Sequence, residues 1–341
     1  MIPPWRDHFL KGQVIPALPL ALHPDGQWSE RHQRALIRYY SDSGAGGLAV
    51  GVHSTQFAIR EPRHALFEPI LRLAAETITA SADPQPFIRI AGACGPTPAA
   101  AREAELAASL GYHAVLLSPG GWQHAPEEEF LAHTRSISEI LPVIGFYLQT
   151  AVGGRAFSRS FWQRFAAIPG VAGIKIAPFN RYQTIDVIHA VTNAGRRDLA
   201  LYTGNDDNII ADLLTPWPGG LTITGGLLGQ WGVWTSKAVP LLREIHNARS
   251  TGTSPAEWLS RNAALTDANA AIFDATNHFH GCIPGILEVL RRQGLVPSSR
   301  CLDPTETLSE GQAEEISRVS SAYPWLTDDA FVASNLDRWL S

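Results

Sequence analysis

Val171-Ala-Gly-Ile-Lys-Ile-Ala-Pro178 is an apolar run closed by proline and interrupted by one charged residue, Lys175. An apolar run of this length without alternation is typical of a strand buried on both faces, as in a parallel sheet covered by helices. Burial disfavours the charged form of an amine, so Lys175 is expected to be nucleophilic near neutral pH. The alternative is a strand lysine that pairs with an acidic neighbour or extends to solvent.

The rest of the chain repeats this kind of segment between helical patterns. Counting the run at 171–177, the expected strands are residues 14–22, 47–52, 86–92, 113–118, 142–147, 171–177, 199–203 and 220–224. Helix signals lie between them, such as Thr97 followed by Pro98, with Gly111 at the end of that helix. A doubly wound sheet would show a glycine fingerprint after its first strand, and none follows residues 14–22. The pattern therefore predicts an α/β fold of the (β/α)8 TIM barrel type.

Beyond the eighth unit the pattern is helical only. Ser254-Pro-Ala-Glu257 has the spacing of a capping box, a second helix is expected near 283–293, and Ser309-Glu-Gly-Gln312 opens a third. We therefore expect a barrel over residues 1–250 and a C-terminal helical segment over 251–341 that packs on the barrel.

Composition narrows the function classes. The net charge of −5 comes without acidic or basic runs, which argues against nucleic acid or an anionic membrane surface as partner. Cys94, Cys282 and Cys301 lack metal-ligand spacing and fit free thiols in a reducing compartment. The N-terminal stretch lacks the apolar core of a signal peptide. These features predict a cytoplasmic protein whose partners are small molecules and copies of itself.

Catalytic residues of a (β/α)8 barrel lie where the strands end in loops. Besides Lys175, the candidate site residues at those strand ends are His53, Ser54, Thr55, Trp122, Tyr147, Gly204, Asp206, Asp207 and Gly225. Three of them have ordinary structural alternatives. Tyr147 could be a core tyrosine bonded to backbone, His53 a loop histidine bonded to a neighbouring carbonyl, and Asp206 a helix cap.

Over residues 12–300 the order of segments resembles the dihydrodipicolinate synthase / N-acetylneuraminate lyase superfamily of class I aldolases. The matching stretches are Ile90-Ala-Gly-Ala-Cys-Gly95, Leu116-Leu-Ser-Pro119, Phe146-Tyr147, Gly173-Ile-Lys175 and Tyr202-Thr-Gly-Asn-Asp206. The resemblance implies that Lys175 forms a Schiff base and that Tyr147 shuttles protons beside the imine. It also implies that Gly204, Asp206 and Asp207 contact substrate hydroxyls, as in the sugar-acid lyases, and that the chain forms a dimer or tetramer.

The chain departs from the family pattern at the substrate loops. In the second-strand loop, Val52 and His53 replace two hydroxyl residues, although a shift of one residue would bring in Ser54 and Thr55 instead. Gly121, beside Trp122, stands where dihydrodipicolinate synthases carry a second relay tyrosine. Val152 stands in place of their carboxylate-gripping arginine, with Arg155 nearby. A true dihydrodipicolinate synthase activity is therefore not expected.

Together these features predict a Schiff-base lyase or aldolase acting on pyruvate or another 2-oxo acid, including a sugar acid. The loop at residues 51–55 would receive the substrate carboxylate. No metal or organic cofactor is expected, because an iminium itself stabilises the carbanion equivalent. Two alternatives remain open: dehydration of a sugar acid through the same imine, and a catalytically silent barrel that binds a 2-oxo acid.

Overall fold

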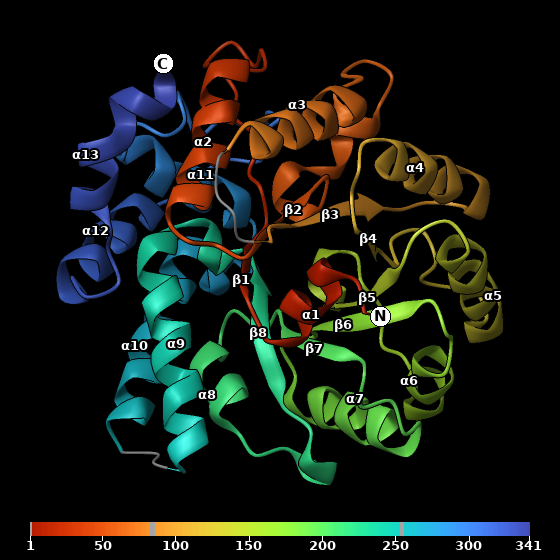
Figure 1. The fold of residues 1–341 in the computed structure, drawn as a ribbon. Helices are drawn as coiled ribbons and strands as arrows, with labels where there is room; N and C mark the ends of the chain where they lie inside the picture. Colours follow the sequence, from red (N-terminus) through yellow and green to blue (C-terminus); the bar gives the residue numbers. More distant parts are fainter. Residues whose placement is uncertain (1, 82–85, 253–255) are drawn as a thin grey trace.

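The computed structural model describes residues 2–81, 86–252 and 256–341. Its strands form one parallel sheet of eight strands in the order β1-β8-β7-β6-β5-β4-β3-β2 (Figure 1). The strands are β1 Val14–Pro16, β2 Gly47–Val50, β3 Ile88–Ala93, β4 Ala114–Leu117, β5 Val143–Leu148, β6 Val171–Ala177, β7 Ala200–Thr203 and β8 Ile223–Leu228. The amide of Leu18 donates to the carbonyl of Ala49 at 2.8 Å, which brings the end of β1 against β2. The predicted (β/α)8 barrel is confirmed.

Helices alternate with the strands and surround the sheet (Figure 1). They are α2 Glu30–Asp42, α3 Phe67–Ala80, α4 Thr97–Ser109, α5 Glu127–Ser138, α6 Arg159–Ala166, α7 Arg181–Asn193, α8 Ile209–Leu214 and α9 Thr235–Thr251. Two of them have side-chain caps: Ser158 accepts from the amide of Phe161 at the start of α6, and Asn180 accepts from the amides of Tyr182 and Gln183 at the start of α7.

The sheet separates two apolar regions. Inside the barrel lie the side chains of one strand face, among them Ile90, Leu116 and Phe146. Phe9, on helix α1 Pro4–Leu10, joins this inner region and stacks on Tyr202 with ring centroids 4.4 Å apart. The other strand face packs against the surrounding helices in a larger apolar cluster. Side chains of neighbouring residues on a strand therefore enter different environments.

The C-terminal part is helical: α10 Glu257–Phe273, α11 Cys282–Arg292, α12 Gln312–Ala322 and α13 Asp329–Leu340. Helix α13 lies beside α2, where Arg38 donates to the carbonyl of Trp339 at 2.6 Å (Figure 1). Helix α10 packs against α8 and α11. The expected capping box falls partly on Ser254 and Pro255, which lie outside the described residues. No helix in the described residues is long and apolar enough to cross a membrane.

The eighth strand begins and ends later than the sequence predicted. Residues 220–224 were expected, but β8 spans Ile223–Leu228, because the apolar run continues past Gly225 and Gly226. A Cβ on Gly225 would lie 2.5 Å from the backbone nitrogen of Gln13, so the glycine permits close packing inside the barrel. Gly225 therefore lies within the sheet and not in a loop at the barrel mouth.

Candidate active site

Lys175 lies on β6 with 7% of its surface exposed, and it lines a cavity. Its Nζ lies 4.4 Å from the centre of the Phe146 ring. The other polar side chains of this cavity are His53, Ser54, Gln149, Asp206 and Cys282. The larger apolar side chains that line it are Val52, Phe146, Leu148, Val152, Phe179 and Phe273. The cavity is thus an apolar recess with one amine and few polar groups, which is typical of a small-molecule site.

Burial changes the proton affinity of the two charged groups in this cavity. Desolvation lowers the pKa of the Lys175 amine from its ordinary value, and the nearby Asp206 carboxylate opposes part of that shift. Desolvation also raises the pKa of Asp206, and the positive charge of Lys175 opposes part of that shift. The amine therefore reaches its neutral form at lower pH than a solvated lysine, and the acid keeps its proton to higher pH than a solvated aspartate.

Asp206 is 5% exposed and follows β7. Its Oδ1 accepts from the backbone amide of Gln230 at 2.7 Å, and the Gln230 side chain in turn accepts from Nδ2 of Asn269 on α10 at 3.0 Å. This backbone contact fixes the carboxyl group at the cavity wall. Helix α8 begins at Ile209 with Asn208 as its N-cap, so Asp206 is not the helix cap.

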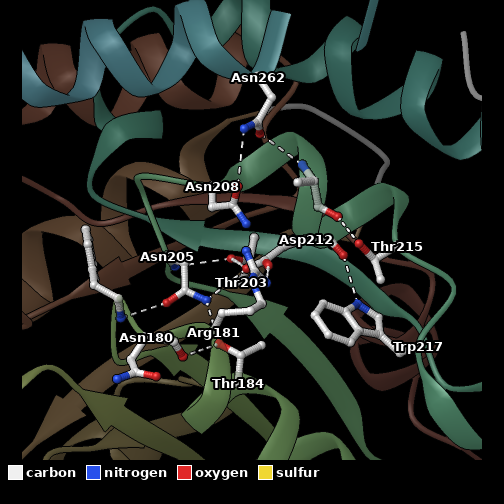
Figure 2. Close-up of polar contacts among 12 residues, drawn as sticks. Asn180, Arg181, Thr184, Thr203, Asn205, Asn208, Asp212, Thr215, Trp217 and Asn262 are labelled. Atoms are coloured by element: carbon white, nitrogen blue, oxygen red, sulfur yellow. Dashed lines mark hydrogen bonds and ion pairs between the residues drawn. The ribbon is translucent and has the colours of Figure 1, made fainter. Parts of the chain in front are cut away.

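A buried polar cluster behind the cavity holds the loop that carries Gly204 and Asp206. Figure 2 shows the side chains of Thr203, Asn205 and Arg181 converging on Asp212, which is fully buried. Oδ2 of Asp212 accepts from Thr203 Oγ1 at 2.6 Å and from Asn205 Nδ2 at 2.9 Å, and Oδ1 pairs with Arg181. A buried carboxylate requires such partners, so this cluster keeps the residues on either side of Gly204 in place.

The same cluster shapes the loop after β6. Oδ1 of Asn205 accepts from the backbone amide of Phe179 at 3.0 Å. Phe179 has a φ of 53°, a left-handed conformation that few residues other than glycine adopt. The hydrogen bond helps to hold this conformation, and Phe179 lines the cavity. One asparagine thus connects two loops of the site.

In the loop after β2, the structure brings residues from both of the registers left open by the sequence to the cavity. Ser54 is 3% exposed, and it lines the cavity together with His53. Oγ1 of Thr55 instead donates to the carbonyl of Leu18 at 2.7 Å and accepts from the amide of Gly51 at 3.0 Å, away from the cavity. Burial, followed by the charge of Lys175, lowers the pKa of His53 to about 4, which keeps its ring neutral at pH 7.

Tyr147 does not face Lys175. Its side chain lies between β5 and the helices, with its ring centroid 4.9 Å from that of Trp162, and its hydroxyl accepts from the backbone amide of Phe157 at 3.4 Å. This is the core placement that the sequence left open as the alternative. The residue that pairs with Lys175 across the two strands is Phe146, which has no hydroxyl.

Other expected site residues also lie away from the cavity. The Trp122 ring stacks on His133 with centroids 4.6 Å apart, and its Nε1 donates to the carbonyl of Gly95. Arg155 donates to the carbonyls of Trp122 and Ala125 and so is not positioned to grip a substrate in this cavity. Asp207 is not among the residues that line the cavity.

The sequence did not identify Gln149, Phe273 and Cys282 as cavity residues. Gln149 follows β5, as does Val152, which the sequence had placed at a substrate loop, while Phe273 and Cys282 come from α10 and α11. No local motif marks the last two, because their position depends on how the C-terminal helices pack over the barrel. A cluster of three or more His, Cys, Asp or Glu side chains suited to a metal ion does not occur in the part of the chain that the structure describes.

Comparison with known proteins decides the family. The model of the Dihydrodipicolinate synthetase family matches residues 10–322. The chain belongs to this family. It is 25% identical over 307 residues to the 4-hydroxy-tetrahydrodipicolinate synthase of Dechloromonas aromatica, covering 84% of this chain and 99% of that one. The enzyme of the same name from Aromatoleum aromaticum is 29% identical over 225 residues, 64% of this chain and 71% of that one.

Solved structures of family members share the fold. The dihydrodipicolinate synthase of Thermotoga maritima superimposes with a TM-score of 0.76 at 19% identity, over 92% of this chain and 99% of that one. The N-acetylneuraminate lyase of Fusobacterium nucleatum complexed with pyruvate gives 0.72 at 17% identity, over 94% and 99%. The family is one of pyruvate-dependent class I aldolases and lyases.

Proposed function

We propose that this family member forms a Schiff base between Lys175 and pyruvate or another 2-oxo acid, and acts as a lyase or aldolase. The observation that carries the proposal is the placement of a buried amine, whose pKa burial lowers, in the lining of a largely apolar cavity. A neutral amine attacks a carbonyl carbon, whereas an ammonium group cannot. The polar groups His53 and Ser54 lie at one side of the cavity and are suited to orient the substrate carboxylate.

In the proposed reaction, Nζ of Lys175 attacks C2 of the 2-oxo acid to form a carbinolamine. Loss of water then gives an iminium, which withdraws electrons from C3. This permits a bond at C3 to form or break, or a β-hydroxyl to leave, without a separate electron sink. Cleavage, condensation and dehydration share this intermediate, and the cavity by itself favours none of them.

The lining supports a compact substrate with an apolar portion. The cavity beside Lys175 has room for only a few groups of the size of water, which suits the small 2-oxo acid end of a substrate. A wider opening of about 480 Å³ adjoins it and shares His53, Val152 and Cys282. We infer that the 2-oxo acid end binds beside Lys175, that its apolar portion contacts the aromatic lining, and that bulkier groups extend into the wider opening.

A catalytically silent barrel that binds a 2-oxo acid is the second candidate. It is favoured by one observation, the phenyl ring of Phe146 where the resemblance implied a proton-carrying hydroxyl. Such a protein would bind pyruvate reversibly and would form no covalent adduct.

Borohydride reduction separates the two candidates. The protein is incubated with pyruvate and with a panel of aliphatic, aromatic and hydroxylated 2-oxo acids, then reduced and weighed by mass spectrometry. A Schiff-base enzyme gains the mass of the reduced adduct, and a peptide map places it on Lys175. A silent binder gains no mass with any member of the panel.

Lys175→Met is the matched control, because methionine keeps much of the apolar body and removes the amine. We expect this variant to fold and to gain no adduct. Lys237→Met, on α9, removes a lysine outside the cavity and should be trapped like the wild type. Adduct formation in Lys175→Met at the wild-type level would overturn the assignment.

A further inference from the structure

We infer that the Asp206 carboxyl group performs the proton transfers at the carbinolamine stage, in place of a tyrosine hydroxyl. This inference rests on the proposed Schiff-base chemistry. It follows from the composition of the cavity: forming an imine requires a group that gives a proton to the substrate oxygen, and the side chain paired with Lys175 across the strands is phenylalanine.

The geometry of Asp206 suits this task. Oδ1 is held by the amide of Gln230 at 2.7 Å, so the carboxyl group has a fixed position at the cavity. The carboxyl group and the amine line the same cavity and influence each other's charge, yet they form no direct ion pair. Because both groups line the same cavity, a substrate carbonyl group bound there can meet the amine and the carboxyl group. Burial further raises the pKa of Asp206, so the group can hold a proton near neutral pH.

The other titratable groups that face the cavity are less suited. The pKa of His53, lowered to about 4 mainly by burial, leaves the ring without a proton to donate as an acid at pH 7. Burial raises the pKa of the Cys282 thiol well above its ordinary value, so it does not readily lose its proton. Ser54 has a hydroxyl, but an aliphatic hydroxyl is a far weaker acid than a carboxyl group. Asp206 is thus the group in this cavity able both to give and to take a proton.

The proton balance closes with this residue alone. Neutral Lys175 attacks C2, and the developing alkoxide takes the proton of the Asp206 carboxyl group. The Asp206 carboxylate then removes a proton from the attacking nitrogen, which leaves a neutral carbinolamine. Asp206 next protonates the hydroxyl group, the C–O bond breaks, and water leaves as the nitrogen lone pair forms the iminium. The carboxylate that remains offsets the positive charge of the iminium.

The test follows adduct formation with pyruvate over time, with borohydride quenching and intact-mass detection. Asp206→Asn keeps an oxygen that can accept from the Gln230 amide but cannot exchange a proton in this way. We expect it to slow adduct formation by about 10²- to 10⁴-fold, the usual range for a positioned acid–base group. Asp207→Asn, next in the chain but not on the cavity lining, is the matched control and should stay within about threefold of the wild type by the same scale.

A double variant tests the replacement directly. Phe146→Tyr places a hydroxyl beside Nζ of Lys175. The double variant with Asp206→Asn should form the adduct at least tenfold faster than Asp206→Asn alone. Urea unfolding of each variant establishes that the fold is retained. An Asp206→Asn rate equal to wild type, or an equal loss in Asp207→Asn, would overturn the inference while the Schiff base stands. A wild type that forms no adduct at all would overturn both.

Discussion

Phe146 pairs with Lys175 across strands β5 and β6, and its ring lies 4.4 Å from Nζ of the lysine. The pairing depends on a one-residue shift in register. Val143 pairs with Val171, but Ile144 pairs with Gly173, so Ala172 is left over. After such a bulge, each residue of one strand shares its sheet face with a different residue of the partner strand, one position further along the chain. Counted from Val143 and Val171 without the bulge, Tyr147 would have stood opposite Lys175.

Tyr147→Phe should therefore have little effect on catalysis. We expect adduct formation and turnover to stay within about twofold of the wild type, whereas loss of the hydroxyl contact to Phe157 should cost about 1 kcal/mol of unfolding free energy. The measurements are adduct kinetics and urea unfolding. A loss of rate in the range typical of an acid–base group would return Tyr147 to the reaction.

Gly204→Ala should impair the amine directly. A Cβ at this position would lie 2.5 Å from Cε of Lys175 and 2.7 Å from Cβ of Ala177. Because these contacts are too close, the lysine side chain must move, and misplacement of a reacting group can cost about 10²-fold in rate. Gly120→Ala is the control, since its Cβ would contact only Ser118 Oγ, at 3.3 Å. Equal adduct rates in the two variants would contradict this prediction.

The rate of adduct formation should change with pH at values below the pKa of an ordinary lysine. Burial lowers the pKa of Lys175 from 10.5, so the fraction of neutral amine increases as pH rises through the lowered value. We expect the rate to rise with that fraction and to fall again at high pH, where Asp206 no longer holds the proton that it gives to the substrate oxygen. Between the lowered pKa and 10.5, Lys175 is protonated in the unfolded chain but largely neutral in the folded protein. Its contribution to stability therefore also increases with pH in this range. Initial adduct rates from pH 6 to about 11 check the first point. A rate that continues to rise up to pH 10.5 would show an unperturbed lysine.

Condensation of pyruvate with aspartate semialdehyde should be negligible, despite the names of the relatives. No arginine is among the residues that line the cavity, and Arg155 is engaged by the carbonyls of Trp122 and Ala125. The carboxylate that aspartate semialdehyde brings to the reaction would therefore lie against Val152 and other apolar side chains. A coupled assay with dihydrodipicolinate reductase measures the reaction. Turnover comparable to that of an authentic synthase would refute the prediction.

Asp212→Ala should destabilise the protein more than it alters the reacting groups. The variant leaves Arg181 without its buried partner and frees Thr203 and Asn205. Each hydrogen bond to a charged group typically contributes about 1.5–3 kcal/mol of unfolding free energy, so loss of the two from Thr203 and Asn205 should cost a few kcal/mol. Urea unfolding measures the loss, and Asp186→Ala, at an exposed ion pair with Arg159, should cost less than about 1 kcal/mol. Similar losses in the two variants would show that the cluster does not hold the loop.

The sequence by itself determined the barrel and the position of its amine. Uninterrupted apolar runs between amphipathic helices can bury both faces only in a parallel sheet covered by helices, and a lysine within the run Val171–Ala177 has no polar strand face to occupy. These properties are local, because they depend on hydrophobic periodicity within one segment.

Only the tertiary structure decided what surrounds the amine. A bulge at Ala172 placed Phe146 and not Tyr147 beside Lys175, and no local signal marks that shift, because it arises from the pairing of two strands. Phe273 and Cys282 reach the cavity through the packing of α10 and α11 over the barrel. The roles of residues in this site thus depend on strand register and helix packing, which are set by contacts between segments far apart in the chain.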